Sequence, residues 1–176
     1  MPNWCNNSIT IKGSTETIKT LWEEATAEDG GLLNAMVPMP VELEGTTAPS
    51  EDGVDWYSWR VSNWGTKWDV SLEGLGFTDN GDGTATIEGY FDSAWAPPID
   101  AYNTFCEDMD GVYLEAYYEE GGMCFVGYWD SEGADDHYEY DGATSDTVRN
   151  MIPEYLVDYY ALDERLDEYE QMEMED

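Results

Sequence analysis

Acidic side chains are the most abundant candidates for chemistry in this chain, and many of them stand in adjacent pairs. The 176 residues include 40 Asp and Glu, with pairs such as Glu23-Glu24, Glu119-Glu120 and Asp135-Asp136. Two carboxylates can act as general acid and base, or can bind Mg²⁺ or Ca²⁺. At this density such pairs arise by chance, so they predict neither catalysis nor a dedicated metal site.

The other reactive side chains do not assemble into a familiar catalytic set. His137 is the only histidine, so we exclude a multi-histidine metal site and expect no histidine-based triad. Cys5, Cys106 and Cys124 have no C-x-x-C spacing, and we expect them to be buried free thiols in a reducing cytosol. No glycine-rich phosphate loop is present. The inventory therefore predicts a protein that is not an enzyme and has no cofactor.

Tryptophans form the second group of chemically capable residues. Trp4, Trp64, Trp68 and Trp95 occur near the ends of expected strands, and Lys67 lies between two of them. A tryptophan-lined surface with one lysine could stack a base, another ring or a peptide proline. The alternative is that these rings pack a sheet against helices and that Lys67 pairs with a nearby carboxylate.

The charge of the whole chain is the feature that most restricts its partners. Only 6 Lys and Arg offset the acids, which gives a formal charge of −34. Between Lys67 and Arg149 there are 20 acidic residues and no basic residue. Such a surface repels nucleic acid and lipid and attracts basic proteins. No apolar run is long enough to span a membrane, so we expect a cytoplasmic protein without direct nucleic-acid or membrane binding.

Periodicity predicts the elements that must position these side chains. Alternating or apolar segments bounded by turns predict strands over residues 4–12, 67–77, 84–92, 112–119, 123–130 and 137–140. Helical spacing predicts helices from Ser14 to about residue 29, over 99–108, from Ser145 to Pro153, and over 154–170. The order βαββαβ indicates an α+β, ferredoxin-like split βαβ fold. Its antiparallel sheet would have extra edge strands and be followed by an acidic C-terminal helix.

We expect two parts in the chain. Residues 1–130 form the ferredoxin-like domain, and residues 131–176 form an acidic extension whose helix packs on this domain or on a partner. Five apolar residues of the last helix recur at spacings of four and three, namely Tyr155, Tyr159, Leu162, Leu166 and Tyr169. This seam would serve a homodimer as well as an internal core.

Three segments resemble the signatures of a known family. They are Met-Pro-Asn-Trp-Cys-Asn-Asn at 1–7, Asn-Trp-Gly-Thr-Lys-Trp-Asp at 63–69 and Phe-Asp-Ser-Ala-Trp-Ala-Pro-Pro at 91–98. They are similar to those of the YubB-like family of small phage and plasmid proteins. Ser93 and Ala96 stand where that family often has Thr and Ser. The resemblance covers about residues 1–130 and implies a ferredoxin-like fold and a mobile-element origin, but no biochemical activity.

The acidity and the resemblance together predict a DNA mimic that inhibits a basic DNA- or RNA-binding host protein, such as a restriction or CRISPR effector. Carboxylates one helical turn apart are separated by about 6 Å, comparable to neighbouring phosphates, and they can pair with arginines of a nucleic-acid groove. The predicted contact residues are Asp135, Asp136, Glu139, Asp158, Asp163, Glu164, Asp167, Glu168 and Glu170.

Two alternatives stay open at this point. Proteins of concentrated-salt cytosols are acidic and poor in lysine, so the charge could be an adaptation to salt. The chain could also be a small-ligand or peptide binding module that uses the surface around Lys67. Mimicry needs acid concentrated on one elongated face, whereas salt adaptation spreads it over all faces.

Overall fold

The computed structural model describes residues 2–175 and has a six-stranded antiparallel sheet at its centre. The strands are β1 Trp4–Ser14, β2 Leu75–Asp79, β3 Thr84–Ala94, β4 Tyr113–Glu120, β5 Phe125–Asp130 and β6 Asp135–Glu139. Their order in the sheet is β2-β3-β1-β4-β5-β6. The first four strands have the split βαβ arrangement. The predicted α+β fold class with extra edge strands is therefore confirmed.

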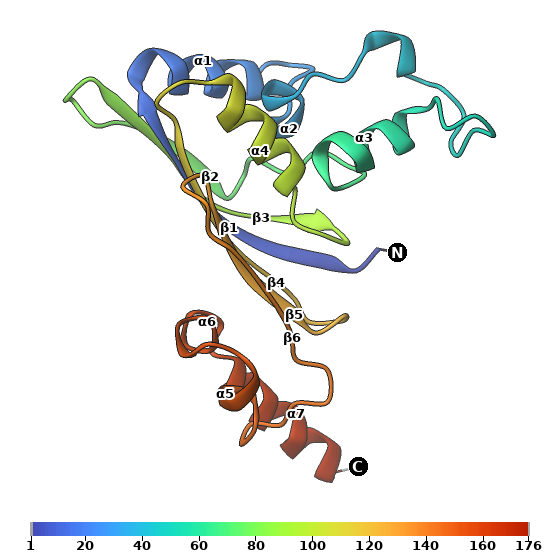
Figure 1. Cartoon of the computed structure of the whole chain (residues 1–176), viewed down its shortest axis with the longest axis vertical. Coiled ribbons are helices and arrows are strands. Elements are labelled where there is room, and N and C mark those ends of the chain that lie inside the picture. The colour runs from blue at the N-terminus through green and yellow to red at the C-terminus, as the bar shows by residue number, and fades with distance from the viewer. Residues whose placement is uncertain (1, 176) are drawn as a thin grey trace.

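Helices cover both faces of this sheet. They are α1 Thr15–Ala25, α2 Leu32–Met36, α3 Trp56–Trp64, α4 Ile99–Asp108, α5 Val148–Met151, α6 Glu154–Tyr160 and α7 Leu162–Glu175, with a 3-10 turn η1 at Val41–Leu43. Figure 1 shows α1, α2 and α4 on one side of the sheet and the α5–α7 group on the other. Each side has its own buried cluster, one around Ile11 and Tyr102 and one around Val126 and Leu156. Side chains alternate across a strand, so β4 and β5 contribute to both clusters; β5, for example, supplies Trp129 to the first and Val126 to the second.

The second predicted strand is wrong over most of its length. Residues 66–74 are irregular and β2 begins only at Leu75. The cause is Asp69, whose carboxylate accepts the backbone N–H groups of Leu33 and Asn34, both at 2.9 Å. This carboxylate provides acceptors for two free N–H groups in the first turn of α2. The chain around Asp69 therefore lies against α2 instead of pairing in the sheet.

The last predicted helix is two helices with a break. Ala161 has a left-handed backbone, with φ of 48°, and it ends α6 before α7 starts. The break divides the predicted apolar seam between the two helices. Leu162 is buried, whereas Tyr155, Tyr159 and Tyr169 are exposed. The buried contacts of α6 come instead from Leu156 and Val157.

A buried carboxylate organises the long loop before α3. Both oxygens of Asp55 accept hydrogen bonds, Oδ1 from Ser58 N at 2.8 Å and Oδ2 from Ser50 N at 2.9 Å. These bonds, led by that from the Ser50 backbone, lower the pKa of Asp55 to about 2. A lowered pKa stabilises the fold above the unfolded value near 3.8. This contribution is lost as the pH falls through the folded value.

We therefore expect Asp55→Asn to lower the melting temperature at pH 6 and to lose that effect in acid. The substituted amide places an N–H₂ donor against the Ser50 N–H. Melting curves between pH 6 and pH 2 measure the difference in melting temperature between the wild type and the variant. This difference should become smaller as the pH falls below about 4. A difference that stays constant over this range would contradict the assigned role.

Candidate functional site

The three signature segments meet at one end of the sheet. The Asn7 side chain donates to the Ser93 hydroxyl at 2.8 Å, which joins β1 to β3. The Thr66 hydroxyl donates to the carbonyl oxygen of Ala94, also at 2.8 Å. Asn7, Thr66, Ser93 and Ala94 are all buried. The signature segments are thus connected through buried side chains, and we call this region the structural joint. The Ser93 hydroxyl, which the change from Thr keeps, accepts one of its hydrogen bonds.

Trp64 belongs to this joint and not to the predicted ligand surface. Its side chain is fully buried, and its indole N–H donates to the carbonyl oxygen of Val37 at 2.9 Å. Gly65 follows in a left-handed conformation that ends α3. The prediction that Trp64 lines an exposed surface is therefore corrected: Trp64 packs the core.

The other predicted tryptophans are exposed, and two of them are in contact. Trp4 and Trp68 have ring centroids 6.0 Å apart, and Trp95 is 48% exposed. The Lys67 ammonium lies 4.1 Å from the centroid of the Trp68 ring, within the range of a cation–π contact. Within residues 2–175, no carboxylate forms an ion pair with Lys67. The nearby carboxylate of Asp69 accepts hydrogen bonds from the backbone of α2 instead.

Trp56 and Arg60 extend this site, although neither was predicted from the sequence to belong to it. The Arg60 guanidinium carbon lies 5.3 Å from the Trp56 ring and 4.8 Å from the Trp64 ring. A cavity of about 270 Å³ opens beside them, lined by Met39, Glu44, Gly45, Trp56, Arg60 and Trp68. The signal in the sequence was the spacing of four residues between Trp56, Arg60 and Trp64, which places them on one helical face.

The acidic residues predicted to bind a partner fall into two groups. Five of them are held by other side chains or the backbone of this chain: Asp136 by Tyr155, Asp158 and Asp163 by Arg149, Asp167 by Gln171, and Glu170 by Ser145. The other four have no such partner among the described residues, namely Asp135 and Glu139 on β6 and Glu164 and Glu168 on α7. The candidate contact face is therefore smaller than predicted.

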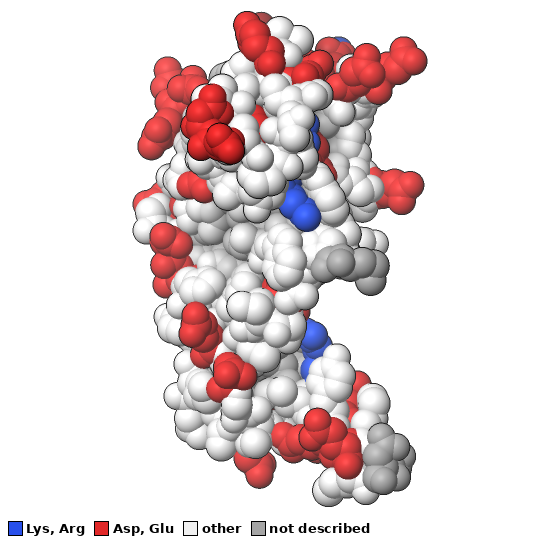
Figure 2. Space-filling model, turned by 90° about the vertical axis from the view of Figure 1, so that its right-hand side faces the viewer, with Lys and Arg blue, Asp and Glu red and all other residues white. Residues whose placement is uncertain are grey.

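Acid is present over much of the molecule as well as in the C-terminal part. Figure 2 shows Asp and Glu at the upper end, along the left margin and at the lower end of one face, with few Lys or Arg. The C-terminal part is nevertheless denser, because residues 131–176 hold 16 of the 40 acids. The overall spread is what salt adaptation predicts, and the local density is what mimicry predicts.

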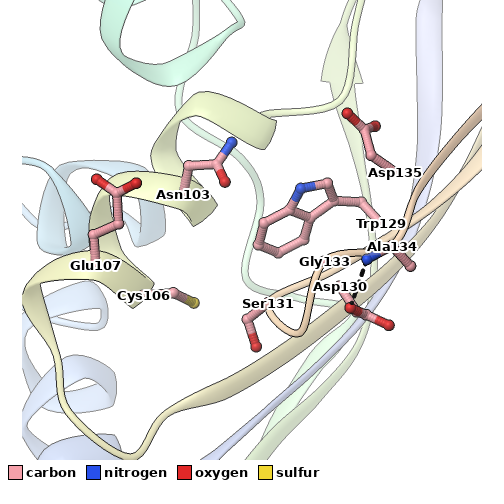
Figure 3. Close-up of a pocket in the computed structure, with 9 residues that line it drawn as sticks. All are labelled: Asn103, Cys106, Glu107, Trp129, Asp130, Ser131, Gly133, Ala134 and Asp135. Carbon is pink, nitrogen blue, oxygen red and sulfur yellow. Dashed lines mark hydrogen bonds between the residues drawn. The ribbon is translucent and has the colours of Figure 1, made fainter.

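A second cavity, of about 360 Å³, lies between α4 and the turn that joins β5 to β6. Figure 3 shows Asn103, Cys106 and the Trp129 indole projecting toward the space between these elements. Asp130 is turned back to its own turn and accepts the Ala134 N–H at 3.1 Å. Burial raises the pKa of the Cys106 thiol to about 11, so the thiol is protonated at neutral pH and is a poor nucleophile.

The remaining titratable groups add no further centre. Cys5, Cys106 and Cys124 are free thiols, as predicted, although only Cys5 is fully buried. The described residues contain no group of three or more His, Cys, Asp or Glu arranged to hold a metal ion. Within the same part of the chain, no helix has both the length and the apolar character that crossing a membrane requires.

Comparison with known proteins places the chain in a family through residues 64–171. The profile of the family described as "Ferredoxin-like domain in Api92-like protein" matches residues 64–171. The crystal structure of a protein Api92 from Yersinia pseudotuberculosis is similar, with 17% sequence identity and a TM-score of 0.41. The match covers 63% of this chain and 39% of that chain, so this protein spans well under half the length of that structure. No curated protein matches this chain.

Proposed function

We propose that this protein acts as a DNA mimic. The chain belongs to the family of Api92-like proteins with a ferredoxin-like domain. In this proposal it is a YubB-like protein of phage or plasmid origin and works in the host cytoplasm. It would occupy the nucleic-acid groove of a basic DNA- or RNA-binding defence protein, such as a restriction or CRISPR effector, and inhibit it.

The main observation behind this proposal is that both C-terminal arginines, Arg149 and Arg165, form ion pairs with carboxylates of this chain. Arg149 pairs with Asp158 at 2.9 Å and with Asp163 at 2.7 Å. Arg165 pairs with the buried Glu119 at 3.2 Å. Both cations of the densest acidic region are thus paired within the chain. The acids left on its surface, including Glu164 and Glu168, are available to an external partner.

The spacing of charge along α7 supports the same proposal. Its 14 residues include seven Asp and Glu, and a helix of this length extends about 21 Å. Along the helix axis one carboxylate then occurs about every 3 Å, close to the axial rise of roughly 3.4 Å per phosphate along one DNA strand. Arginines placed to bind phosphates can form charge-assisted hydrogen bonds with carboxylates at this spacing.

A basic partner fits α7 better than a second copy does. The exposed Tyr169 and Met172 lie on α7 beyond the buried Leu162, so the helix has apolar surface that a partner could cover. A homodimer through α7 would bring the acids of two identical helices together, and like charges repel. We therefore keep the homodimer as the less favoured arrangement.

The test is binding to a candidate effector, identified by pull-down and then purified, with two charge-reversal variants. Glu164→Lys/Glu168→Lys changes unpaired acids of α7, and Glu24→Lys/Glu28→Lys changes exposed acids at the other end of the molecule by the same net charge. We expect the α7 variant to weaken binding at least about tenfold and the control to weaken it far less. Binding should also fall steeply with salt and be competed by DNA.

Salt adaptation is the second candidate, and the spread of acids in Figure 2 favours it. It predicts that the two double variants behave alike: neither changes binding, and both lower stability in molar salt by similar amounts. That outcome would replace the DNA-mimic proposal.

A further inference from the structure

We infer that the cavity beside α3 is a binding site for a small aromatic anion of the nucleoside monophosphate type. The site consists of Arg60, Trp56 and Trp68, and Lys67 lies over the Trp68 ring. It is separate from the acidic surface of α7. This inference is independent of the proposed DNA mimicry, and either can fail without the other.

Arg60 has an unsatisfied donor beside two tryptophans. Its guanidinium carbon lies 5.3 and 4.8 Å from the centroids of the Trp56 and Trp64 rings, within the range of cation–π contacts. Its Nε is buried and has no hydrogen-bond partner. A buried donor without an acceptor is costly, and a guanidinium can bind an oxyanion through two parallel N–H groups. Burial lowers the pKa of Arg60, and the charges of Asp69 and Glu44 oppose that shift.

The few cations of this protein are unevenly placed. Of its 6 Lys and Arg, Lys19, Arg149 and Arg165 form ion pairs with carboxylates. Of the remaining three, Arg60 lines the cavity, and Lys67 contacts the ring of Trp68, which is part of the cavity wall. In a chain with 40 acids, two cations without an ion-pair partner among the described residues, one in the cavity and one against its wall, indicate that the local preference is for an anion.

The cavity has an aromatic wall and a size that suits one ring system. Trp56 and Trp68 both line it, and nucleobases stack on aromatic side chains in other proteins. The volume of about 270 Å³ is slightly below the range of roughly 300–1,000 Å³ that is usual for ligand pockets. This space suits one ring system with a phosphate at the mouth, and not an oligonucleotide.

Glu44 is the one carboxylate in the lining, and it provides the sharpest test. It lies close enough to Arg60 to raise its pKa, so it competes with an incoming oxyanion. Glu44→Gln is therefore expected to tighten binding, which a merely damaged site cannot do. Glu42→Gln is the matched control, because Glu42 is also exposed but does not line the cavity.

The experiment titrates the full-length protein with adenosine 5′-monophosphate, adenosine and inorganic phosphate, followed by calorimetry and tryptophan fluorescence. We expect the monophosphate to bind, and adenosine and inorganic phosphate each to bind at least about tenfold more weakly. Arg60→Gln and Trp68→Ala should each weaken binding by about tenfold or more. Tyr90→Ala, an exposed aromatic away from the cavity, should leave it unchanged.

Each other result overturns the inference. If the monophosphate does not bind at millimolar concentration, the cavity is not the proposed binding site. If inorganic phosphate binds as tightly as the monophosphate, the tryptophans do not bind an aromatic ring. Equal affinity for the wild type, Glu44→Gln and Arg60→Gln places any binding elsewhere. Trp68 is on the surface, so Trp68→Ala keeps the test valid if Arg60→Gln does not fold.

Discussion

Replacing Trp64 by Ala is expected to lower the free energy of unfolding by about 3–5 kcal/mol, the usual cost of removing a large buried aromatic side chain. Its side chain is fully buried, edge-on to Trp59 with ring centroids 5.8 Å apart. The substitution also leaves the carbonyl oxygen of Val37 without its donor. Urea unfolding followed by circular dichroism measures the change.

The control for this prediction comes from the same heptapeptide. Trp68 is 39% exposed, so Trp68→Ala removes less buried surface and should have a much smaller effect on stability. If the two variants lost similar stability, Trp64 would not have the core position assigned to it. The comparison also separates roles, because we expect Trp64 to matter for folding and Trp68 for the ligand.

The two tryptophans show why the sequence predicted a surface where the structure has a joint. In a strand the alternation of side chains decides which residues point inward, and residues 67–77 were expected to be a strand. The segment before them is in fact helix α3, where positions four apart share a face. Aromatic and β-branched residues have only moderate helix propensity, and α3 is rich in them. Its pattern therefore did not predict a helix.

The elements that were predicted well have strong local signals. Ser14 caps α1, and its hydroxyl accepts the Thr17 N–H, which is the capping pattern that the sequence indicated. Strand β3 and helix α4 follow from alternation and from Pro98 at the helix start. These features depend on residues that are close in sequence, so they can be recognised without knowledge of tertiary contacts.

The candidate acidic face was predicted less well because ion pairing depends on distant residues. The pairs of Arg149 join α5 to α6 and α7, and Asp136 meets Tyr155 across the interface between β6 and α6. No periodicity in the sequence reports these contacts. Which carboxylates remain for a partner is thus a property of the tertiary structure, and it reduced the predicted face to its unpaired members.

Removing the Arg165 side chain is the second prediction with a large effect. Arg165 lies on α7 and reaches Glu119 of β4, whose side chain is 6% exposed. Glu119 also accepts a hydrogen bond from Tyr140. Arg165→Met leaves a buried carboxylate without its counter-ion. The loss for a broken buried pair is about 3–5 kcal/mol, and we expect the lower part of that range because Arg165 is 39% exposed.

A double-mutant cycle tests this pair directly. Glu119→Gln keeps the shape and a hydrogen-bonding oxygen for Tyr140, so Glu119→Gln/Arg165→Met should recover part of the stability that Arg165→Met loses. Arg149→Met is the matched control, because its ion pairs lie at the surface, where such pairs stabilise little. A double variant no more stable than Arg165→Met would contradict the coupling.

The same cycle connects stability with the proposed function. The Arg165–Glu119 pair is the described ion pair that joins α7 to the sheet, so it holds the acidic helix in place. If the helix acts as a DNA mimic, Arg165→Met should weaken partner binding although it makes the protein more negative. Recovery of binding in Glu119→Gln/Arg165→Met would show that the position of α7 matters, since the double variant carries the wild-type net charge. Stronger binding by Arg165→Met would instead mean that the partner responds to charge alone.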